Sequence, residues 1–218
     1  PPHLTEGGED KVESVDRMAI DLGLSTEEAP ELVSPGDRVL VRAPQTRLLG
    51  TRITSPAPDD RAGCDALIRF AQLLRNQTLS CGLTILLSSR EEAGGQGAQT
   101  GAYSLEPTEA IAVDVSFAAQ PGVDPAKCGQ LGGGPMIGMA PILNRPMTNR
   151  LLELAKEHEI PYSMEIMGGE TGTNADEIAV SRTGVPTAMV SIPLRYMHTP
   201  VEVIDTQDVA YTARLLAE

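Results

Sequence analysis

The chain has 218 residues, of which 41% are hydrophobic and 22% charged, a composition ordinary for a soluble globular protein with one large domain or one domain and part of another. Its formal net charge of -13 disfavours binding to nucleic acid, whose phosphates would be repelled, and to anionic membrane surfaces. No apolar run approaches the ~20 residues that span a bilayer, and the first residues lack the pattern of a signal peptide. We therefore expect no nucleic-acid partner and no membrane partner.

The three cysteines, Cys64, Cys81 and Cys128, are odd in number and widely spaced, without a Cys-x-x-Cys pair. This pattern indicates reduced thiols rather than a disulfide framework or a zinc ribbon, and it favours a cytoplasmic location. The chain contains no Trp, two Phe and four Tyr, so it offers little aromatic surface for stacking on bases or sugars.

The first part of the chain, residues 1–52, consists of short strand and turn patterns. Met18–Leu22 is a short apolar run that predicts a strand, and Arg38–Val41 alternates polar and apolar residues as a half-buried strand does. Between them, Ser25–Glu28 has the pattern of a capping box, which predicts a short helix running toward Val33. These elements are too few for an independent domain, so we expect part of a small β domain.

From residue 53 onward strand and helix patterns alternate, which is typical of a three-layer α/β domain with a mainly parallel sheet. Apolar residues at helical spacing predict helices, and short apolar runs predict strands. The expected helices cover residues 61–75, 147–155, 174–183 and 207–217, and the expected strands cover residues 83–88, 110–115, 162–166 and 186–192.

Two adjacent glutamates, Glu91 and Glu92, follow the expected strand at residues 83–88, where a run of glycines begins. Neighbouring side chains of a strand point to opposite faces, so both carboxylates can serve one site only if the chain leaves strand geometry there. The glycines permit such a turn. An isolated Glu-Glu pair after a strand is more often a solvated loop, so the interpretation depends on other candidates.

Three further positions carry candidate side chains. Asp59 and Asp60 stand immediately before the expected helix at 61–75, where Asp60 is equally well explained as the helix N-cap. Asp114 lies in an apolar strand, where a carboxylate is costly unless it is paired or holds a metal; the alternative is the exposed end of a strand. His198 follows the strand that ends near residue 193, and a lone histidine there is more often structural.

These side chains are placed at the carboxyl ends of strands or at a helix start, where an open α/β sheet gathers its site. Converging carboxylates repel one another unless a cation lies between them. A mixed carboxylate and imidazole set suits zinc, cobalt or manganese better than calcium. Two metal ions bridged by one carboxylate polarise a carbonyl and lower the pKa of a shared water, whose proton a glutamate outside the ligand set can take. The pattern favours metal-dependent hydrolysis.

Six motifs occur in an order and spacing that resemble those of the tetrahedral-type dinuclear metallo-aminopeptidases, the family of glutamyl and deblocking aminopeptidases, in which some members carry an endoglucanase label. The motifs are Asp-Asp-Arg-Ala-Gly (59–63), Glu-Glu-Ala-Gly-Gly-Gln-Gly-Ala (91–98), Ile-Ala-Val-Asp-Val (111–115), Gly-Gly-Gly-Pro (132–135), Thr-Gly-Thr-Asn-Ala-Asp (171–176) and Arg-Tyr-Met-His-Thr-Pro (195–200). The resemblance covers the whole chain. It implies part of a small, PDZ-like β dimerisation domain at residues 1–52. It also implies a three-layer α/β/α zinc-peptidase-like domain at residues 53–218 that is incomplete at its N-terminal side.

By position, the resemblance implies a ligand set for two divalent metal ions, zinc or cobalt with manganese as an alternative. Asp59 resembles the carboxylate that bridges both ions, and its peptide bond to Asp60 would be cis. Glu92 and His198 resemble the terminal ligands of one ion, and Asp114 resembles a ligand of the other.

The resemblance also implies roles outside the ligand set. Glu91 resembles the general base of the reaction. The loop at residues 171–176 resembles part of the wall on the substrate side, which assigns Thr173 to substrate binding, together with Arg195 from the last motif. The same loop is equally well explained as a helix start capped by Thr173 or Asn174.

One feature of the family is missing from the sequence. The family has a His-x-Asp motif, whose histidine completes the metal site of Asp114, in a part of the catalytic domain that precedes the inserted β domain. His3 lies in what resembles the inserted domain, and His158 lies in a charged helical stretch that is typical of a surface. We therefore expect one metal site to be nearly intact in this chain and the other crippled, with one metal ion or none bound.

The leading hypothesis is that the full-length protein is a metal-dependent aminopeptidase that acts on peptides. As a homo-oligomer, it would assemble from dimers into a larger, dodecameric particle. A second hypothesis is a catalytically silent fragment or scaffold of the same fold. A third is a glycoside hydrolase that uses Glu91 and another carboxylate as acid and base. The scarcity of aromatic residues and the presence of His198 disfavour this third hypothesis.

Overall fold

The structure is a computed structural model that describes residues 14–218. The chain divides into two compact units, Pro1–Val41 and Arg42–Glu218. The division at Val41 falls before the predicted domain boundary near residue 52, and the assignment of residues 1–52 to a β domain stays a prediction.

In the first unit, the described residues form a 3-10 turn, η2 (Val15–Arg17), and the short helix α1 (Ala29–Leu32). Glu28 accepts a hydrogen bond from the Ser25 N–H at 2.9 Å, and the Glu28 N–H donates to Ser25 Oγ at 3.2 Å. This reciprocal pair is the predicted capping box, and it precedes the helix as expected.

The two strands expected in the first unit are not formed. Residues 18–22 and 38–41 have no strand structure, and their apolar side chains are exposed, Leu40 to 85%. A strand needs a neighbour to complete its backbone hydrogen bonds, and no described strand pairs with either segment. The expectation of strands here is therefore wrong.

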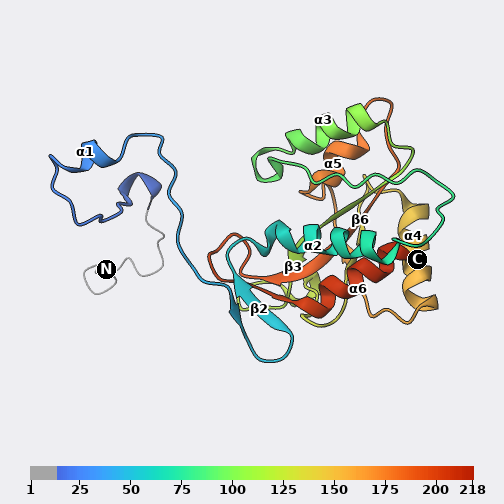
Figure 1. Ribbon diagram of the computed structural model, residues 1–218. Coiled ribbons are helices and arrows are strands. Elements are labelled where there is room, and N and C mark those ends of the chain that lie inside the picture. The colour runs from blue at the N-terminus through green and yellow to red at the C-terminus, as the bar shows by residue number, and fades with distance from the viewer. Residues whose placement is uncertain (1–13) are drawn as a thin grey trace. The chain divides into compact units, whose positions relative to one another are not determined.

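The second unit contains a seven-stranded sheet and helices on both of its faces (Figure 1). The strands are β1 (Thr46–Arg47), β2 (Arg52–Ser55), β3 (Ala110–Phe117), β4 (Met136–Met139), β5 (Ser163–Ile166), β6 (Thr187–Arg195) and β7 (Glu202–Asp205). The helices are α2 (Pro58–Leu73), α3 (Gln96–Leu105), α4 (Arg145–Glu157), α5 (Asn174–Ala179) and α6 (Thr206–Ala217), with 3-10 turns η3 (Glu91–Ala93) and η4 (Pro125–Lys127). None of the helices in residues 14–218 has the length and apolar character needed to cross a membrane.

Strand β6 is the centre of the sheet. It runs parallel to β3 along one edge, while β4 and β7 pair with its other edge in antiparallel orientation. All of its residues except Arg195 are buried, as expected for a strand covered on both faces. The sequence predicted a mainly parallel sheet, but the sheet is mixed, with β1–β2, β2–β7, β4–β6 and β6–β7 all antiparallel. For β7 the reason is that residues 196–201 are too short a connection to return the chain for a parallel strand.

Alternate side chains of β6 enter different cores. Ile192 and Leu194 pack on one face with Ala66 of α2, while Met189 packs on the other face with Ala175 of α5. Figure 1 shows α2 beside α6, and α3 beside α5. The sheet is therefore covered on both faces.

The expected helices at 61–75, 147–155 and 207–217 are confirmed as α2, α4 and α6, and the strands at 110–115, 162–166 and 186–192 as β3, β5 and β6. The helix expected at 174–183 is shorter, because α5 ends at Ala179.

The strand expected at residues 83–88 is not formed. This segment has no strand structure, and Leu83 and Leu87 are 46% and 54% exposed. No strand within residues 14–218 pairs with it, so its apolar pattern has no neighbour against which to be buried.

Candidate metal centre

The chain turns sharply at the glutamate pair. Arg90 has a left-handed φ of 62°, Gly94 and Gly95 have φ of 109° and 69°, and Glu91 and Glu92 lie between them in η3. This turn removes the alternation of a strand, so both carboxylates can face one site, as the sequence predicted. Glycine adopts such φ values at little cost, which explains the glycines at the end of the turn.

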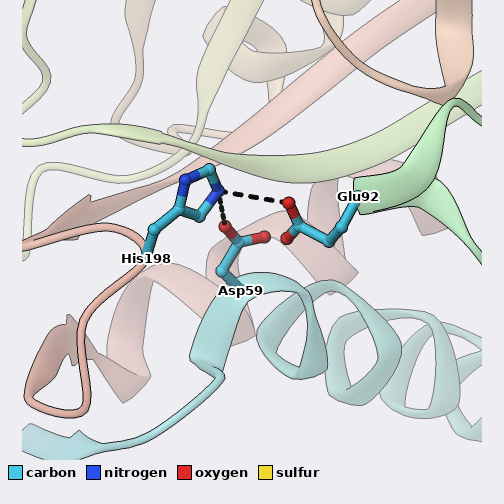
Figure 2. A group of neighbouring side chains, drawn as sticks. All are labelled: Asp59, Glu92 and His198. Atoms are coloured by element: carbon cyan, nitrogen blue, oxygen red, sulfur yellow. Dashed lines mark ion pairs between the residues drawn. The ribbon is translucent and has the colours of Figure 1, made fainter. Parts of the chain in front are cut away.

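Three side chains from separate segments meet at this point (Figure 2). Asp59 lies at the start of α2, Glu92 in η3, and His198 in the loop that follows β6. His198 Nε2 is 3.1 Å from Asp59 Oδ2 and 3.2 Å from Glu92 Oε2. One ligand atom of each residue lies within 4.8 Å of the others, a spacing that fits one metal ion.

The chemistry of these donors also fits a metal ion. Two carboxylates and one imidazole are the ligands that zinc and related transition metals bind in catalytic sites, where a further position stays open. The Asp59 side chain is only 8% exposed, whereas that of His198 is 65% exposed. The group is therefore buried on the side of Asp59 and open to solvent on the side of His198, where a substrate can approach.

The two aspartates at the start of α2 point to different partners. Their peptide bond is cis, as the resemblance implied. Asp59 and Asp60 have non-helical φ and ψ, so the continuous part of α2 begins at Arg61. The Asp60 carboxylate accepts a hydrogen bond from the Gly63 N–H at 2.8 Å and so caps this part of the helix, as the N-cap alternative predicted. A Cβ at Gly63 would overlap this carboxylate, so the glycine makes room for the cap. Asp59 is thereby left free to face His198.

Negative charge accumulates at the exposed side of the site. Burial raises the pKa of Asp59 to about 6, and the carboxylates of Glu92 and Glu202 add to the shift, while His198 opposes it. Burial also raises the pKa of Glu91, with a further contribution from Glu92. Each of these carboxylates is less stable as an anion than in water, and a bound cation would relieve that cost.

The interior of the site contains two more carboxylates. Burial raises the pKa of Asp60 to about 9, with Asp114 as the second cause. Burial also raises the pKa of Asp114 to about 7, although the Val115 N–H, which donates to its Oδ1 at 2.8 Å, opposes the shift. Asp114 is 7% exposed, so the alternative of an exposed strand end is wrong. It lies outside the group of three ligand atoms.

The residues assigned to substrate binding have structural surroundings that explain part of their presence. Thr173 is the N-cap of α5 and accepts a hydrogen bond from the Ala175 N–H, so the alternative of a helix start is confirmed. Asn174 Nδ2 donates to Ser88 Oγ at 3.0 Å. Arg195 ends β6, and its buried Nε has no hydrogen-bond partner in the described residues. Substrate binding by Thr173 and Arg195 stays a prediction.

Sequence reasoning missed one residue of this site. Glu202, at the start of β7, is 2% exposed, and its carboxylate accepts hydrogen bonds from the N–H groups of Asp59 (3.0 Å) and His198 (2.7 Å). The available signal was a single glutamate among apolar residues, where a carboxylate is as costly as that of Asp114 in β3. His158, by contrast, is exposed and pairs with Glu218, as expected of a surface histidine.

A mixed sheet covered by helices on both faces, together with a group of two carboxylates and one imidazole, defines an α/β protein with a candidate metal centre. More specifically, the chain belongs to the M42 glutamyl aminopeptidase family, whose sequence model matches residues 1–215.

The individual relatives agree with this membership. The chain is 36% identical to a lysyl aminopeptidase of Pyrococcus furiosus over 99% of its own length and 63% of that protein. The structure of a TET aminopeptidase from a marine-sediment thaumarchaeote matches with a TM-score of 0.86 and 29% identity, over 100% of this chain and 63% of that one. The TET1 peptidase of Pyrococcus horikoshii matches with a TM-score of 0.77 and 28% identity, over 100% of this chain and 64% of that one. The chain thus spans about three fifths of the length of its relatives.

Proposed function

We propose that the protein represented by this chain is a metal-dependent aminopeptidase that removes N-terminal residues from peptides. The observation that carries the proposal is the meeting of Asp59, Glu92 and His198 within the reach of one metal ion. Membership of the M42 glutamyl aminopeptidase family supports the choice of substrate, because the chemistry of the ligands alone is compatible with several hydrolytic reactions.

In this proposal Asp59, Glu92 and His198 would hold one divalent ion, and Asp59 and Asp114 would hold a second one. Bound ions would polarise the carbonyl of the scissile peptide and lower the pKa of a water molecule. The high pKa of Asp114 and Asp59 supports this assignment, since their surroundings favour neutralisation of the carboxylates.

Glu91 is the proposed general base. Its carboxylate takes the proton of the attacking water and delivers it to the leaving amine. Burial raises the pKa of Glu91, which brings it closer to the working range of a general base at neutral pH. Thr173 and Arg195 are proposed to line the substrate side.

The ion site of Asp114 is proposed to be weak in this chain. The described residues contain one histidine besides His198, namely His158, and its ring pairs with Glu218 at the end of α6. A site without its imidazole ligand should hold its ion poorly. We therefore propose one ion or none for this chain, and impaired activity when it is alone.

The proposed architecture is a three-layer α/β/α zinc-peptidase-like domain at residues 53–218, preceded by part of a β dimerisation domain at residues 1–52. We also propose that the protein forms homo-oligomers, dimers that assemble into a larger and dodecameric particle. The support for this is the TET1 peptidase of Pyrococcus horikoshii, which is described as assembling into a tetrahedron or a large octahedral shell.

Hydrolysis of aminoacyl-p-nitroanilides, with added zinc, cobalt or chelator, tests the function. The expected result is hydrolysis that requires metal. Metal binding without hydrolysis would favour a silent scaffold. Hydrolysis that persists in excess chelator would reject a metal-dependent peptidase.

A further inference from the structure

We propose that Glu202 is a positioning residue that sets the distance between two ligands of the metal centre by holding both of their backbones. The inference rests on the proposed function of Asp59 and His198 as ligands. The Glu202 carboxylate is 2% exposed, and each of its oxygens accepts one N–H, that of Asp59 on Oε2 at 3.0 Å and that of His198 on Oε1 at 2.7 Å.

The His198 loop needs such an anchor. Tyr196 and His198 both have left-handed φ, 60° and 61°, a conformation that residues other than glycine keep only when their surroundings enforce it. The Tyr196 N–H is fixed by Gln120 Oε1 at 2.7 Å, and the His198 N–H is fixed by Glu202. Without Glu202, the His198 N–H would lose this hydrogen bond.

The same carboxylate also holds the other ligand. Asp59 lies in a non-helical turn, with φ of -79° and ψ of 111°, and its N–H donates to Glu202. Glu202 is opposite Ser55 in the pairing of β2 with β7, so the sheet fixes its own backbone. A single rigid carboxylate therefore connects the two segments whose side chains, His198 Nε2 and Asp59 Oδ2, are 3.1 Å apart.

The two hydrogen bonds require a carboxylate. Both partners are N–H donors, and an ionised carboxylate offers two acceptor oxygens, with stronger hydrogen bonds than a neutral group makes. A glutamine would offer one oxygen and turn its NH₂ group toward the second N–H. Glu202→Gln therefore keeps the size of the side chain and disrupts one of the two connections.

The chain offers a matched control in Asp208. This aspartate of α6 is 0% exposed, and it accepts hydrogen bonds from the Gly132 N–H and the Gly134 N–H, both at 2.8 Å. It has the same buried arrangement as Glu202 but connects no candidate ligand. Asp208→Asn should therefore perturb the fold in a comparable way without a direct effect on the metal centre.

The first measurement is a cobalt titration of the 218-residue chain and both variants. Binding is monitored by calorimetry and by the visible absorption of bound Co²⁺. Glu202→Gln should weaken cobalt binding by about 10- to 100-fold and change the absorption spectrum, as loss of a residue behind a ligand does. Asp208→Asn should leave both unchanged. Equal effects of the two variants, or none from Glu202→Gln, would overturn the positioning role while the metal centre stands.

The second measurement is amide hydrogen exchange in chelator, which does not depend on metal. Glu202→Gln should speed exchange at the amides of Asp59 and His198 selectively, relative to the unsubstituted chain and to Asp208→Asn. If the unsubstituted chain binds no cobalt, which the proposal of one ion or none allows, exchange at these amides still decides whether Glu202 holds them. Unchanged exchange at both would overturn the inference.

Glu202→Asp keeps two acceptor oxygens on a shorter side chain, and it serves if Glu202→Gln does not fold. It should restore part of the amide protection and of the cobalt affinity. A Glu202→Asp variant that folds but protects neither amide and binds cobalt as tightly as the unsubstituted chain would also reject the role.

Discussion

The carboxylates of the site form two sets that differ in their partners. Asp59 and Glu92 meet an imidazole, His198, in a group whose His198 and Glu92 side chains are open to solvent, while the Asp59 side chain is 8% exposed. Asp60 and Asp114 lie in the interior, and burial raises their pKa to about 9 and about 7. The first set is arranged as ligands. In the second set, Asp60 caps α2, and Asp114 lacks an imidazole partner in the described residues.

This comparison teaches that a high pKa alone does not identify a ligand. Asp60 has the higher pKa of the interior pair, yet the Gly63 N–H occupies one of its oxygens. Geometry separates the two sets where titration does not, because a metal ion needs several donor atoms within one coordination sphere.

The largest effect is expected from Glu91→Gln. Loss of the general base should lower turnover by about 10²- to 10⁴-fold, and metal content should not change, because Glu91 is outside the group of three. Aminoacyl-p-nitroanilide hydrolysis and metal analysis measure the two quantities, with Glu109→Gln, an exposed glutamate, as control. Parallel loss of metal and turnover would instead make Glu91 a ligand.

The set that meets the imidazole can be disrupted by His198→Ala. Loss of a residue that positions a ligand weakens metal binding by about 10- to 100-fold, and loss of the imidazole ligand itself should weaken cobalt binding by more than that. Calorimetry on the 218-residue chain measures this, and His158→Ala provides an exposed histidine as control. Cobalt affinity that survives His198→Ala would show that the ion binds elsewhere.

The interior set can be tested through pH in the metal-free chain. Because burial raises the pKa of Asp114 from 3.8 to about 7, the folded chain holds this proton more tightly than the unfolded chain. The contribution of Asp114 to the free energy of unfolding is complete below pH 3.8 and is lost as the pH rises to about 7. Between these two values the free energy of unfolding falls by about 1.4 kcal/mol per pH unit.

Asp114→Asn should therefore flatten the decline of the free energy of unfolding with rising pH. Urea denaturation in chelator at a series of pH values measures this decline, and Asp65→Asn, at an aspartate whose side chain is 49% exposed, is the control. A decline as steep in Asp114→Asn as in the unsubstituted chain would contradict the buried, protonated state of this carboxyl.

The smallest effect is expected from Gly63→Ala. Its Cβ would overlap the Asp60 carboxylate, so the cap must shift, and the free energy of unfolding should fall by about 1–3 kcal/mol. At Gly168 a Cβ meets no atom within 4 Å, so Gly168→Ala should change the free energy of unfolding by less than about 0.5 kcal/mol. Thermal or urea unfolding compares the two variants, and equal stability would reject the overlap at Gly63.

The sequence predicted those elements whose burial is decided locally. Apolar residues at helical spacing placed α2, α4 and α6, and the uninterrupted apolar run of β6 placed the central strand. The segment at residues 83–88 has an equally apolar pattern, but it lacks a neighbouring strand in the described part of the chain. A pattern reports what a segment can bury, and only the tertiary structure supplies the surface that buries it.

The elements that the sequence did not predict depend on contacts made at a distance. Helix α3 contains Gly97 and Gly101, which weaken a helical pattern, yet a Cβ there would overlap the backbone of Ser89 and the side chain of Leu86. These glycines serve close packing rather than flexibility. Strands β1 and β7 are too short to give a periodic signal, and they are formed by pairing with β2.

The candidate site was predicted in composition but not in construction. Motif spacing identified Asp59, Glu92 and His198, which the structure brings together. It did not identify Glu202, because a single glutamate among apolar residues does not by itself reveal that its carboxylate binds two backbone N–H groups. Its partners become visible only once β7 is placed.

The pairing of β2 with β7 has a consequence for the order of folding. Residues 52–55 and 202–205 come from opposite ends of the second unit, so their pairing closes a long loop and is favoured only after the strands between them are ordered. A slip of one residue in this register would turn Glu202 to the opposite face of the sheet. The metal centre is therefore expected to mature late, and its correct assembly reports that the two ends of the unit have been joined in register.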